Sequence, residues 1–304
     1  MHFLSSDDLN KKEILGIYEL AKKFKNNKTN INIGNKVLGL IFDKASTRTR
    51  VSFQVAMSKI GGSTIDLSKG LTQIGRGEPI KDTSRVLSRY CDVLAIRTFE
   101  QKDIEEYAHW SSIPIINALT DLEHPCQALA DFLTIQEEFQ SFDEVVITFV
   151  GDGNNVANSL IIFSAILGVK IRILCPKGYE PPLKIVDKAR KIDNDIDLVI
   201  TDDFDKALNG TNVLYTDVWS SMGQENEKDS KDIKFKGYTL TLDMLKRVKS
   251  NAIIMHCLPA YRGKEIMEDV FESSQSRIFL QAENRMHAQQ ALLCYLLDKN
   301  LHVF

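Results

Sequence analysis

The sequence contains few cysteines, and no two of them are spaced as in a known disulfide or metal-binding motif. Among its 304 residues there are five, at Cys91, Cys126, Cys175, Cys257 and Cys294. The number is odd, the five lie far apart, and no two form a Cys-x-x-Cys pair. This pattern argues against a disulfide framework and against a zinc site built from thiolates. It favours a reducing compartment, so we expect a cytoplasmic protein.

The sequence also lacks long apolar runs and an excess of basic residues. No run approaches the ~20 apolar residues of a membrane-spanning helix. The first residues include Asp7 and Asp8 and have no apolar core of the signal-peptide type. The formal net charge is −3, whereas a nucleic-acid-binding protein normally carries a basic face. We therefore expect a soluble protein that binds neither a membrane nor nucleic acid.

Short apolar runs alternate with amphipathic stretches, which predicts parallel sheets flanked by helices. In the first half the predicted strands are residues 37–42, 64–67, 93–96 and 113–116, separated by helical stretches such as 81–90 and 103–110. After a long helical pattern at 124–139 the predicted strands are 145–150, 171–174, 198–200, 213–215, 253–255 and 278–280. The fold class is therefore α/β.

The length is sufficient for two domains, each with its own core. We place the first domain at residues 1–134 and the second at residues 135–284, with the boundary in the long helical pattern. A last helix, in the segment 285–304, follows the second domain. Its apolar positions allow it to pack on either domain.

The turn at residues 46–50 is the densest polar feature of the chain. It joins the predicted strand 37–42 to a helical stretch and contains the residues Ser46, Thr47, Arg48, Thr49 and Arg50. A helix start offers unpaired N–H groups, and hydroxyls with guanidinium groups add further donors. The alternative is an N-cap serine followed by solvated arginines, but five such side chains in a row favour a phosphate or carboxylate site.

Further polar residues follow neighbouring predicted strands. Arg97 closes the strand 93–96, and His124 and Gln127 open the long helix. Carboxyl ends of parallel strands share one edge, so these residues are expected to meet the turn at 46–50. Together they can polarise a carbonyl and stabilise the charge on its oxygen, although Arg97 alone reads as a surface cation and His124 as a helix end.

A glycine-containing turn at residues 151–156 raises an alternative from another enzyme class. Gly151 and Gly153 follow a predicted strand, as in a dinucleotide-binding turn. However, Val156 stands where the third glycine belongs, and the next strand ends in Cys175 and Pro176 without an acidic residue for a ribose. A nicotinamide-dependent dehydrogenase is therefore the second choice.

Two later strands also end in polar residues. Asp217 and Ser221 follow the strand 213–215 and can pair with a substrate ammonium group. His256 and Cys257 follow the strand 253–255. Adjacent side chains on an extended strand point to opposite faces, so these two are a poor candidate for a catalytic pair.

Four of these motifs resemble those of the aspartate and ornithine carbamoyltransferases, in that family's order. Residues 42–49, Phe-Asp-Lys-Ala-Ser-Thr-Arg-Thr, resemble its carbamoyl-phosphate motif, and residues 124–127 match its His-Pro-x-Gln motif. Residues 217–223, Asp-x-x-x-Ser-Met-Gly, resemble the ornithine-binding loop, and residues 256–259 are the ornithine-type His-Cys-Leu-Pro. With Arg285 as the family's late arginine, the resemblance spans the whole chain.

The resemblance implies a carbamoyl transfer from carbamoyl phosphate to L-ornithine that yields L-citrulline and phosphate. Arginine biosynthesis is the expected pathway, with citrulline breakdown as the other direction. The family needs no metal and no organic cofactor, forms homotrimers, and sends its C-terminal helix back to the first domain. Other amines, such as putrescine or an acylated ornithine, remain alternative substrates.

The resemblance also assigns roles to single residues. The catalytic residues are Arg97, His124, Asp217 and Cys257. The carbamoyl-phosphate contacts are Ser46, Thr47, Arg48, Thr49, Gln73, Arg97, His124, Gln127, Cys257, Leu258 and Arg285. The ornithine contacts are Asn155, Asp217, Ser221 and Met222. Gln73 acts on a neighbouring subunit's site in the family, and the bond from Leu258 to Pro259 is expected to be cis.

Overall fold

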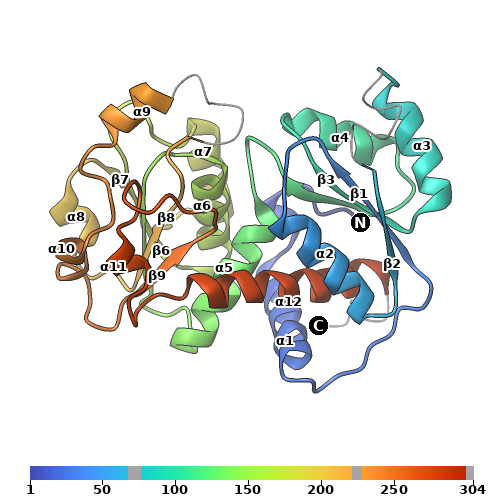
Figure 1. Cartoon of the computed structure of the whole chain (residues 1–304), viewed down its shortest axis with the longest axis horizontal. Coiled ribbons are helices and arrows are strands. Elements are labelled where there is room, and N and C mark those ends of the chain that lie inside the picture. Colours follow the sequence, from blue (N-terminus) through green and yellow to red (C-terminus); the bar gives the residue numbers. More distant parts are fainter. Residues whose placement is uncertain (68–76, 221–227, 299–304) are drawn as a thin grey trace. The chain divides into compact units, whose positions relative to one another are not determined.

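The computed structural model of the chain describes residues 1–67, 77–220 and 228–298, and it confirms the predicted α/β class. The chain divides into two compact units (Figure 1). The first unit contains Met1–Ala130 together with Asn284–Phe304, and the second contains Asp131–Glu283. Each unit is built on one parallel sheet with helices on both faces (Figure 1).

The first unit contains a four-stranded sheet in the order β2-β1-β3-β4. Its elements are η1 (Ser6–Asp8), α1 (Lys11–Lys25), β1 (Val37–Phe42), α2 (Arg48–Lys59), β2 (Ser63–Asp66), α3 (Ile80–Tyr90), β3 (Val93–Arg97), α4 (Gln101–Trp110), β4 (Ile115–Leu119) and the start of α5 (Pro125–Phe139). Strands β1, β3 and β4 are almost entirely buried, as expected for parallel strands covered on both faces.

The second unit contains a five-stranded sheet in the order β7-β6-β5-β8-β9. After the rest of α5 come β5 (Val146–Val150), α6 (Asn155–Leu167), β6 (Lys170–Leu174), α7 (Leu183–Ile192), β7 (Leu198–Thr201), α8 (Phe204–Leu208), β8 (Val213–Thr216), α9 (Lys228–Lys234), α10 (Leu242–Leu245), β9 (Ile253–His256), α11 (Glu268–Phe271) and the start of α12 (Ile278–Leu297). None of the described helices is long and apolar enough to cross a membrane.

The core of the second unit explains why its strands are so apolar. One cluster joins four neighbouring strands to the segments above them, and it includes Val150, Leu174, Leu214, Ile254, Leu208, Phe235, Met244 and Phe271. Helix α6 is buried on nearly all sides and ends at Gly168, whose φ of 76° lies in the left-handed region that glycine adopts without a steric penalty. Burial on both faces makes these elements recognisable as continuous apolar runs.

The predicted strand at residues 278–280 is wrong, because these residues form the first turn of α12. A short apolar run does not distinguish a strand from a buried helix turn. Here Ile278 is buried while Phe279 is 64% exposed, and the next buried polar side chain is Gln281. Arg285, which would have followed that strand at the start of the last helix, consequently lies inside α12.

The C-terminal helix returns to the first unit, as the resemblance implied. From Asn284 onward α12 belongs to that unit. The Tyr295 hydroxyl donates to Glu13 at 2.6 Å, and Lys25 Nζ donates to the Asn284 side chain at 2.7 Å. Both contacts join α12 to α1.

Helix α12 also carries two fully buried glutamines in opposite situations. Gln281 is hydrogen-bonded to Asp131, Tyr215 and the His256 backbone, whereas neither polar atom of Gln289 has a partner among the described residues. An unpartnered buried amide costs about 1–3 kcal/mol.

We expect Gln289→Met to increase the free energy of unfolding and Gln281→Met to decrease it, in urea titrations of both variants. Equal effects of the two substitutions would contradict this account.

Candidate functional site

In the first unit the predicted site residues lie at the carboxyl ends of neighbouring strands. Residues 46–49 follow β1, Arg97 ends β3, and His124 precedes α5 after β4. The chain leaves β1 toward β2 on one side and reaches β3 on the other, which makes a topological switch point. Ligands in open parallel sheets bind at such points. The geometry therefore groups residues that are up to 78 positions apart in the sequence.

The amino end of α2 has the features of an anion site. Thr47 is the N-cap residue, but its side chain makes no capping bond. The first N–H groups of a helix lack partners within the helix, and the helix dipole favours an anion there. Arg48 is exposed and Thr49 is buried in the first turn.

Arg50, the last residue of the predicted polar turn, has a different role. Its guanidinium forms an ion pair with Asp66 of β2 and lies over the Phe42 ring, 5.3 Å from the ring centroid. Arg50 thus fastens α2 to the sheet, while Ser46, Thr47, Arg48 and Thr49 remain at the helix end.

Four buried polar side chains form the second part of this site. Arg97, His124, Gln127 and Arg285 are each no more than 6% exposed. Arg285 Nη1 donates to Gln127 Oε1 at 2.8 Å. Burial, and then the charges of Arg97 and Arg285, hold the pKa of His124 well below its usual 6.5. A neutral imidazole therefore lies close to two guanidinium groups, which together suit a phosphate and an adjacent carbonyl oxygen.

Cys126, between His124 and Gln127, does not belong to this polar group. It is fully buried, and its thiol donates to the Asn117 carbonyl at 3.3 Å. Burial raises the pKa of Cys126, so the thiol stays protonated. Cys126 fills the core beneath the site.

Lys44 is a site-adjacent residue that the sequence analysis did not assign. It is 5% exposed, forms an ion pair with Asp121, and lies 4.4 Å from the centroid of the Phe99 ring. This arrangement ties the loop after β1 to the loop before His124. The sequence indicated Lys44 only through its position inside the motif at residues 42–49.

In the second unit the predicted residues again follow neighbouring strands, at the switch point between β5 and β8. Asp217 comes directly after β8 and is 6% exposed. Its Oδ2 accepts from Asn154 Nδ2 at 2.8 Å, and its Oδ1 accepts from Cys257 Sγ at 2.9 Å and from the Val218 N–H at 2.8 Å. All three donors are neutral groups, and none of them is a cation.

Asn154 was missed by the sequence analysis, which named only its neighbour Asn155. The Asn154 Oδ1 caps α6 by accepting from the N–H groups of Val156 and Ala157, while its Nδ2 holds Asp217. Asn155 is the first residue of α6 and is 8% exposed. The preference of asparagine for N-cap positions was the available signal.

The glycine-containing turn before α6 has a packing explanation. A Cβ on Gly153 would lie 2.3 Å from the Pro181 nitrogen, and the Gly153 N–H donates to the Tyr179 carbonyl at 2.8 Å. The chain segment at residues 179–181 thus lies against Gly153 and leaves no room for a side chain there, so packing accounts for this glycine. The turn does not favour a dehydrogenase.

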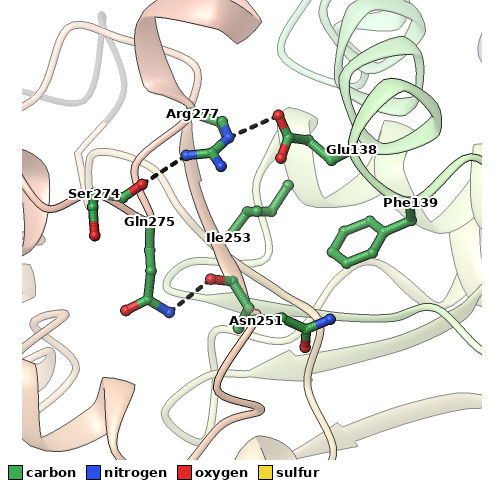
Figure 2. A pocket seen from close by; sticks show the side chains of 8 residues that line it. Glu138, Phe139, Asn251, Ile253, Ser274, Gln275 and Arg277 are labelled. Carbon is green, nitrogen blue, oxygen red and sulfur yellow. Dashed lines mark hydrogen bonds and ion pairs between the residues drawn. The ribbon is translucent and has the colours of Figure 1, made fainter.

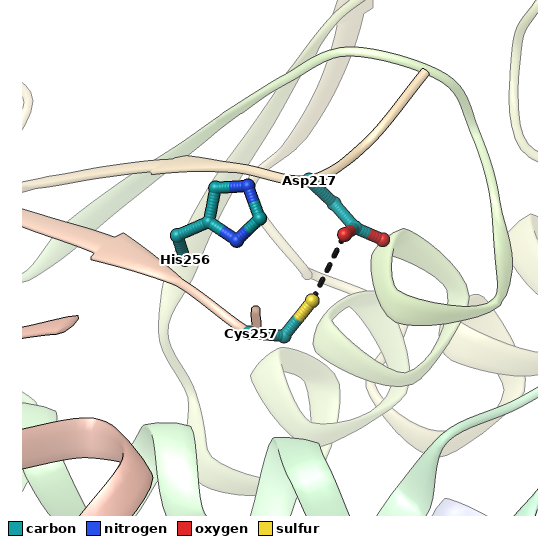
Figure 3. A group of neighbouring side chains, drawn as sticks. All are labelled: Asp217, His256 and Cys257. Carbon is teal, nitrogen blue, oxygen red and sulfur yellow. Dashed lines mark hydrogen bonds between the residues drawn. The ribbon is translucent and has the colours of Figure 1, made fainter. Parts of the chain in front are cut away.

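In the segment at residues 256–259 the side chains of the histidine and the cysteine have different partners. Figure 3 shows Cys257 directed at Asp217, while His256 lies to one side of them. His256 Nδ1 accepts from the Leu258 N–H at 2.8 Å, and Nε2 lies 3.3 Å from Glu265. The Leu258–Pro259 bond is cis, which confirms the expectation from the resemblance.

Asp217, His256 and Cys257 are also the one group of described residues close enough to share a metal ion, within 4.8 Å of one another. Both nitrogens of His256, however, are already engaged, with the Leu258 N–H and with Glu265. A metal ion would have to displace one of these contacts. Within this group the hydrogen bond joins Cys257 to Asp217, while His256 is held by Leu258 and Glu265.

A separate pocket of about 280 Å³ lies in the second unit, where β9 begins. Figure 2 shows Phe139 and Ile253 facing it, with Arg277 bound to Glu138 on one side. Arg277 also donates to the Ser274 and Ser276 carbonyls. Since Cys257 follows the other end of β9, this pocket is distinct from the residues predicted from the sequence.

Three predicted contacts, Gln73, Ser221 and Met222, lie outside the described residues. All the others lie in one of the two groups above. Arg97, His124, Gln127, Arg285 and residues 46–49 are in the first unit, and Asn155, Asp217, Cys257 and Leu258 are in the second.

The lowered pKa of His124 has a consequence for stability. Below pH 6.5 the unfolded chain protonates this imidazole, whereas the folded chain does not. The free energy of unfolding therefore decreases as the pH falls, by up to about 1.4 kcal/mol per pH unit from this group. We expect His124→Gln to reduce this slope in urea titrations between about pH 7.5 and pH 5.5. Identical slopes for the two proteins would show that His124 titrates normally.

The chain matches two family models over nearly its whole length. The model described as "Aspartate/ornithine carbamoyltransferase, carbamoyl-P binding domain" matches residues 1–137, and the "Asp/Orn binding domain" of the same description matches residues 143–296. The two models coincide with the two sheets described above.

Relatives of known sequence or structure agree with these models. The ornithine carbamoyltransferase of Prochlorococcus marinus strain MIT 9312 is 65% identical over 299 residues, which cover 98% of this chain and 97% of that protein. The structure of the Pyrococcus furiosus enzyme of the same name is 42% identical with a TM-score of 0.93, over 97% of this chain and 96% of that one. The Gloeobacter violaceus structure is 44% identical with a TM-score of 0.87, over 98% of both chains. On these matches, the chain belongs to the aspartate/ornithine carbamoyltransferase family.

Proposed function

We propose that this chain transfers the carbamoyl group of carbamoyl phosphate to the side-chain amine of L-ornithine. The products are L-citrulline and phosphate. The proposal is supported by the names of its relatives and by two groups of buried side chains, cationic in the first unit and anionic in the second.

The observation that carries the choice of ornithine is the environment of Asp217. This buried carboxylate is bound by an amide, a thiol and a backbone N–H, and no described cation pairs with it. A buried charge needs a partner of opposite sign. Ornithine carries two ammonium groups that can supply that charge, whereas aspartate carries one ammonium group and a second carboxylate that Asp217 would repel.

The first unit supplies the contacts for carbamoyl phosphate. The phosphate lies at the amino end of α2, bound by Ser46, Thr47, Arg48 and Thr49 together with Arg97. The carbonyl oxygen receives hydrogen bonds from Arg97, Thr49 and neutral His124. Gln127 and the Leu258 carbonyl accept from the carbamoyl NH₂ group, and Arg285 and Cys257 complete the contacts. Gln73 is proposed to reach the site of a neighbouring subunit.

The reaction needs a neutral amine as its nucleophile. The side-chain amine of ornithine has a pKa in water similar to that of lysine, about 10.4, so the site must favour loss of its proton. Asp217 and Cys257 are the groups that guide this proton, while Asn155, Ser221 and Met222 hold the amino acid. A carbon–nitrogen bond forms, the carbon–oxygen bond to phosphate breaks, and phosphate leaves as the bound dianion.

The assembly and compartment are also proposed. We propose a homotrimer in the cytoplasm, in arginine biosynthesis. Exposed Val51 and Val55 on α2 and Ile65 on β2 support contact with another copy of the chain, and light scattering measures the mass of that assembly. None of the five cysteines forms a disulfide, which supports a reducing compartment.

The direct test is citrulline formation by the purified protein from carbamoyl phosphate and ornithine. Aspartate, putrescine and N-acetylornithine serve as parallel amines. We expect product from ornithine alone, because the proposed partner of Asp217 is a free ammonium group of an amino acid that carries no second carboxylate. Product from another amine would overturn the assignment of the second unit and retain that of the first.

Asp217→Asn tests the role of the carboxylate in ornithine binding. The substitution preserves the shape and removes the charge, so kcat/KM for ornithine should fall about 100-fold, as expected for a charge pair that loses one partner. Calorimetric binding of carbamoyl phosphate should remain nearly unchanged, because its phosphate contacts lie in the first unit. Asp202→Asn, at an exposed carboxylate, is the matched control. Equal losses for both substrates would contradict the assignment.

A further inference from the structure

Leu258 has a backbone conformation that needs support from its surroundings. Its φ of 60° lies in the left-handed region, which is unfavourable for a residue with a branched side chain. Its N–H donates to His256 Nδ1 at 2.8 Å. This hydrogen bond joins residues two positions apart and fixes the plane of the peptide between Cys257 and Leu258. The Leu258 carbonyl belongs to the next peptide, to Pro259, so its orientation depends on the His256 ring through this plane and the backbone angles of Leu258.

The hydrogen bonds of His256 define which nitrogen carries the proton. Nδ1 accepts from a backbone N–H, so it has no proton of its own. The proton lies on Nε2, which faces Glu265 Oε1 at 3.3 Å. The same carboxylate oxygen accepts from the Tyr261 N–H at 2.5 Å. Glu265 thus fixes both the tautomer of His256 and the chain beyond Pro259, in the way that a carboxylate orients a ligating or catalytic histidine.

The other side of His256 is also held. Its backbone N–H donates to Gln281 Oε1 at 2.9 Å, and Gln281 Nε2 donates to Asp131 at 2.7 Å. Tyr215 donates to the second oxygen of Asp131 at 3.0 Å. His256, Glu265, Gln281, Asp131 and Tyr215 are all at most 1% exposed. A ring in such a site has no freedom to rotate, so it is suited to holding a neighbouring peptide in place.

We propose that Glu265 and His256 are positioning residues that aim the Leu258 carbonyl at the carbamoyl NH₂ group. Neither residue touches a substrate. Glu265 holds the imidazole in the Nε2–H tautomer, and Nδ1 holds the Leu258 N–H. This inference rests on the proposed function, in which the Leu258 carbonyl contacts the carbamoyl group.

The first test compares Glu265→Gln with Glu265→Met. Glutamine keeps an oxygen that accepts from both His256 and Tyr261, whereas methionine keeps the length and removes the acceptor. We expect kcat of the methionine variant to fall about 100-fold, the usual effect of a small misplacement near a reacting group. Its KM for carbamoyl phosphate and the kcat of Glu265→Gln should stay within about threefold of the parent values. An equal loss of kcat in both variants, or no loss in a folded methionine variant, overturns the proposal.

A second pair covers the case in which Glu265→Met does not fold. His256→Asn places an acceptor oxygen where Nδ1 lies, and His256→Gln keeps a donor near Nε2 but loses that acceptor. We expect the asparagine variant to retain at least about tenfold more kcat than the glutamine variant. A larger or equal kcat of His256→Gln, with both variants folded, contradicts the role of Nδ1.

The parent protein separates failure of this inference from failure of the proposed function. If the parent makes no citrulline, the proposed function fails. If the parent makes citrulline but the two variants within each pair have equal kcat, only the positioning role fails. A crystal structure of Glu265→Met adds a readout without activity, because φ of Leu258 should leave the positive region when the ring is released.

Discussion

Parallel strand pairing is the constraint on which the rest of this structure depends. In a parallel sheet every strand runs the same way, so the loops that follow the strands gather at one edge. In the first sheet this edge brings together residues 46–49, Arg97 and His124. In the second it brings Asn154, Asp217 and Cys257 within hydrogen-bond distance. The chemistry of each unit is therefore a product of its topology, with side chains supplied by separate motifs.

The two units present opposite charges in equally buried settings. In the first, Arg97 and Arg285 are at most 6% exposed, and burial together with their charges lowers the pKa of His124. In the second, Asp217 is 6% exposed and is bound by neutral donors. Removing charges from water is unfavourable unless partners compensate for it. The proposed substrates carry the opposite charges, an anionic phosphate for the first unit and an ammonium group for Asp217, which links the electrostatics of the two units to the proposed function.

Much of this arrangement could be predicted from the sequence, for reasons that particular elements show. Buried parallel strands are continuous apolar runs, so β1, β3, β5 and β8 were recognisable, and polar residues directly after them marked the site. The partners that orient those residues were not recognisable. Asn154 contacts Asp217, which is far from it in the sequence. Glu265 contacts His256, and the spacing of these two residues fits no helix or strand period. Pairings of this kind depend on tertiary packing, which local patterns do not encode.

The one strand that was predicted wrongly shows how buried polar residues decide a local structure. An apolar run at residues 278–280 fits either a strand or a helix turn, and its own side chains do not settle the choice. Gln281 and Arg285 do, because both are buried and each makes a specific hydrogen bond, to Asp131 and to Gln127 respectively. Residues four apart share a face in a helix, whereas a strand that turned into a helix between them would place them on unrelated faces. A continuous helix from Ile278 onward thus brings both polar side chains to their partners, whereas the apolar residues are compatible with either structure.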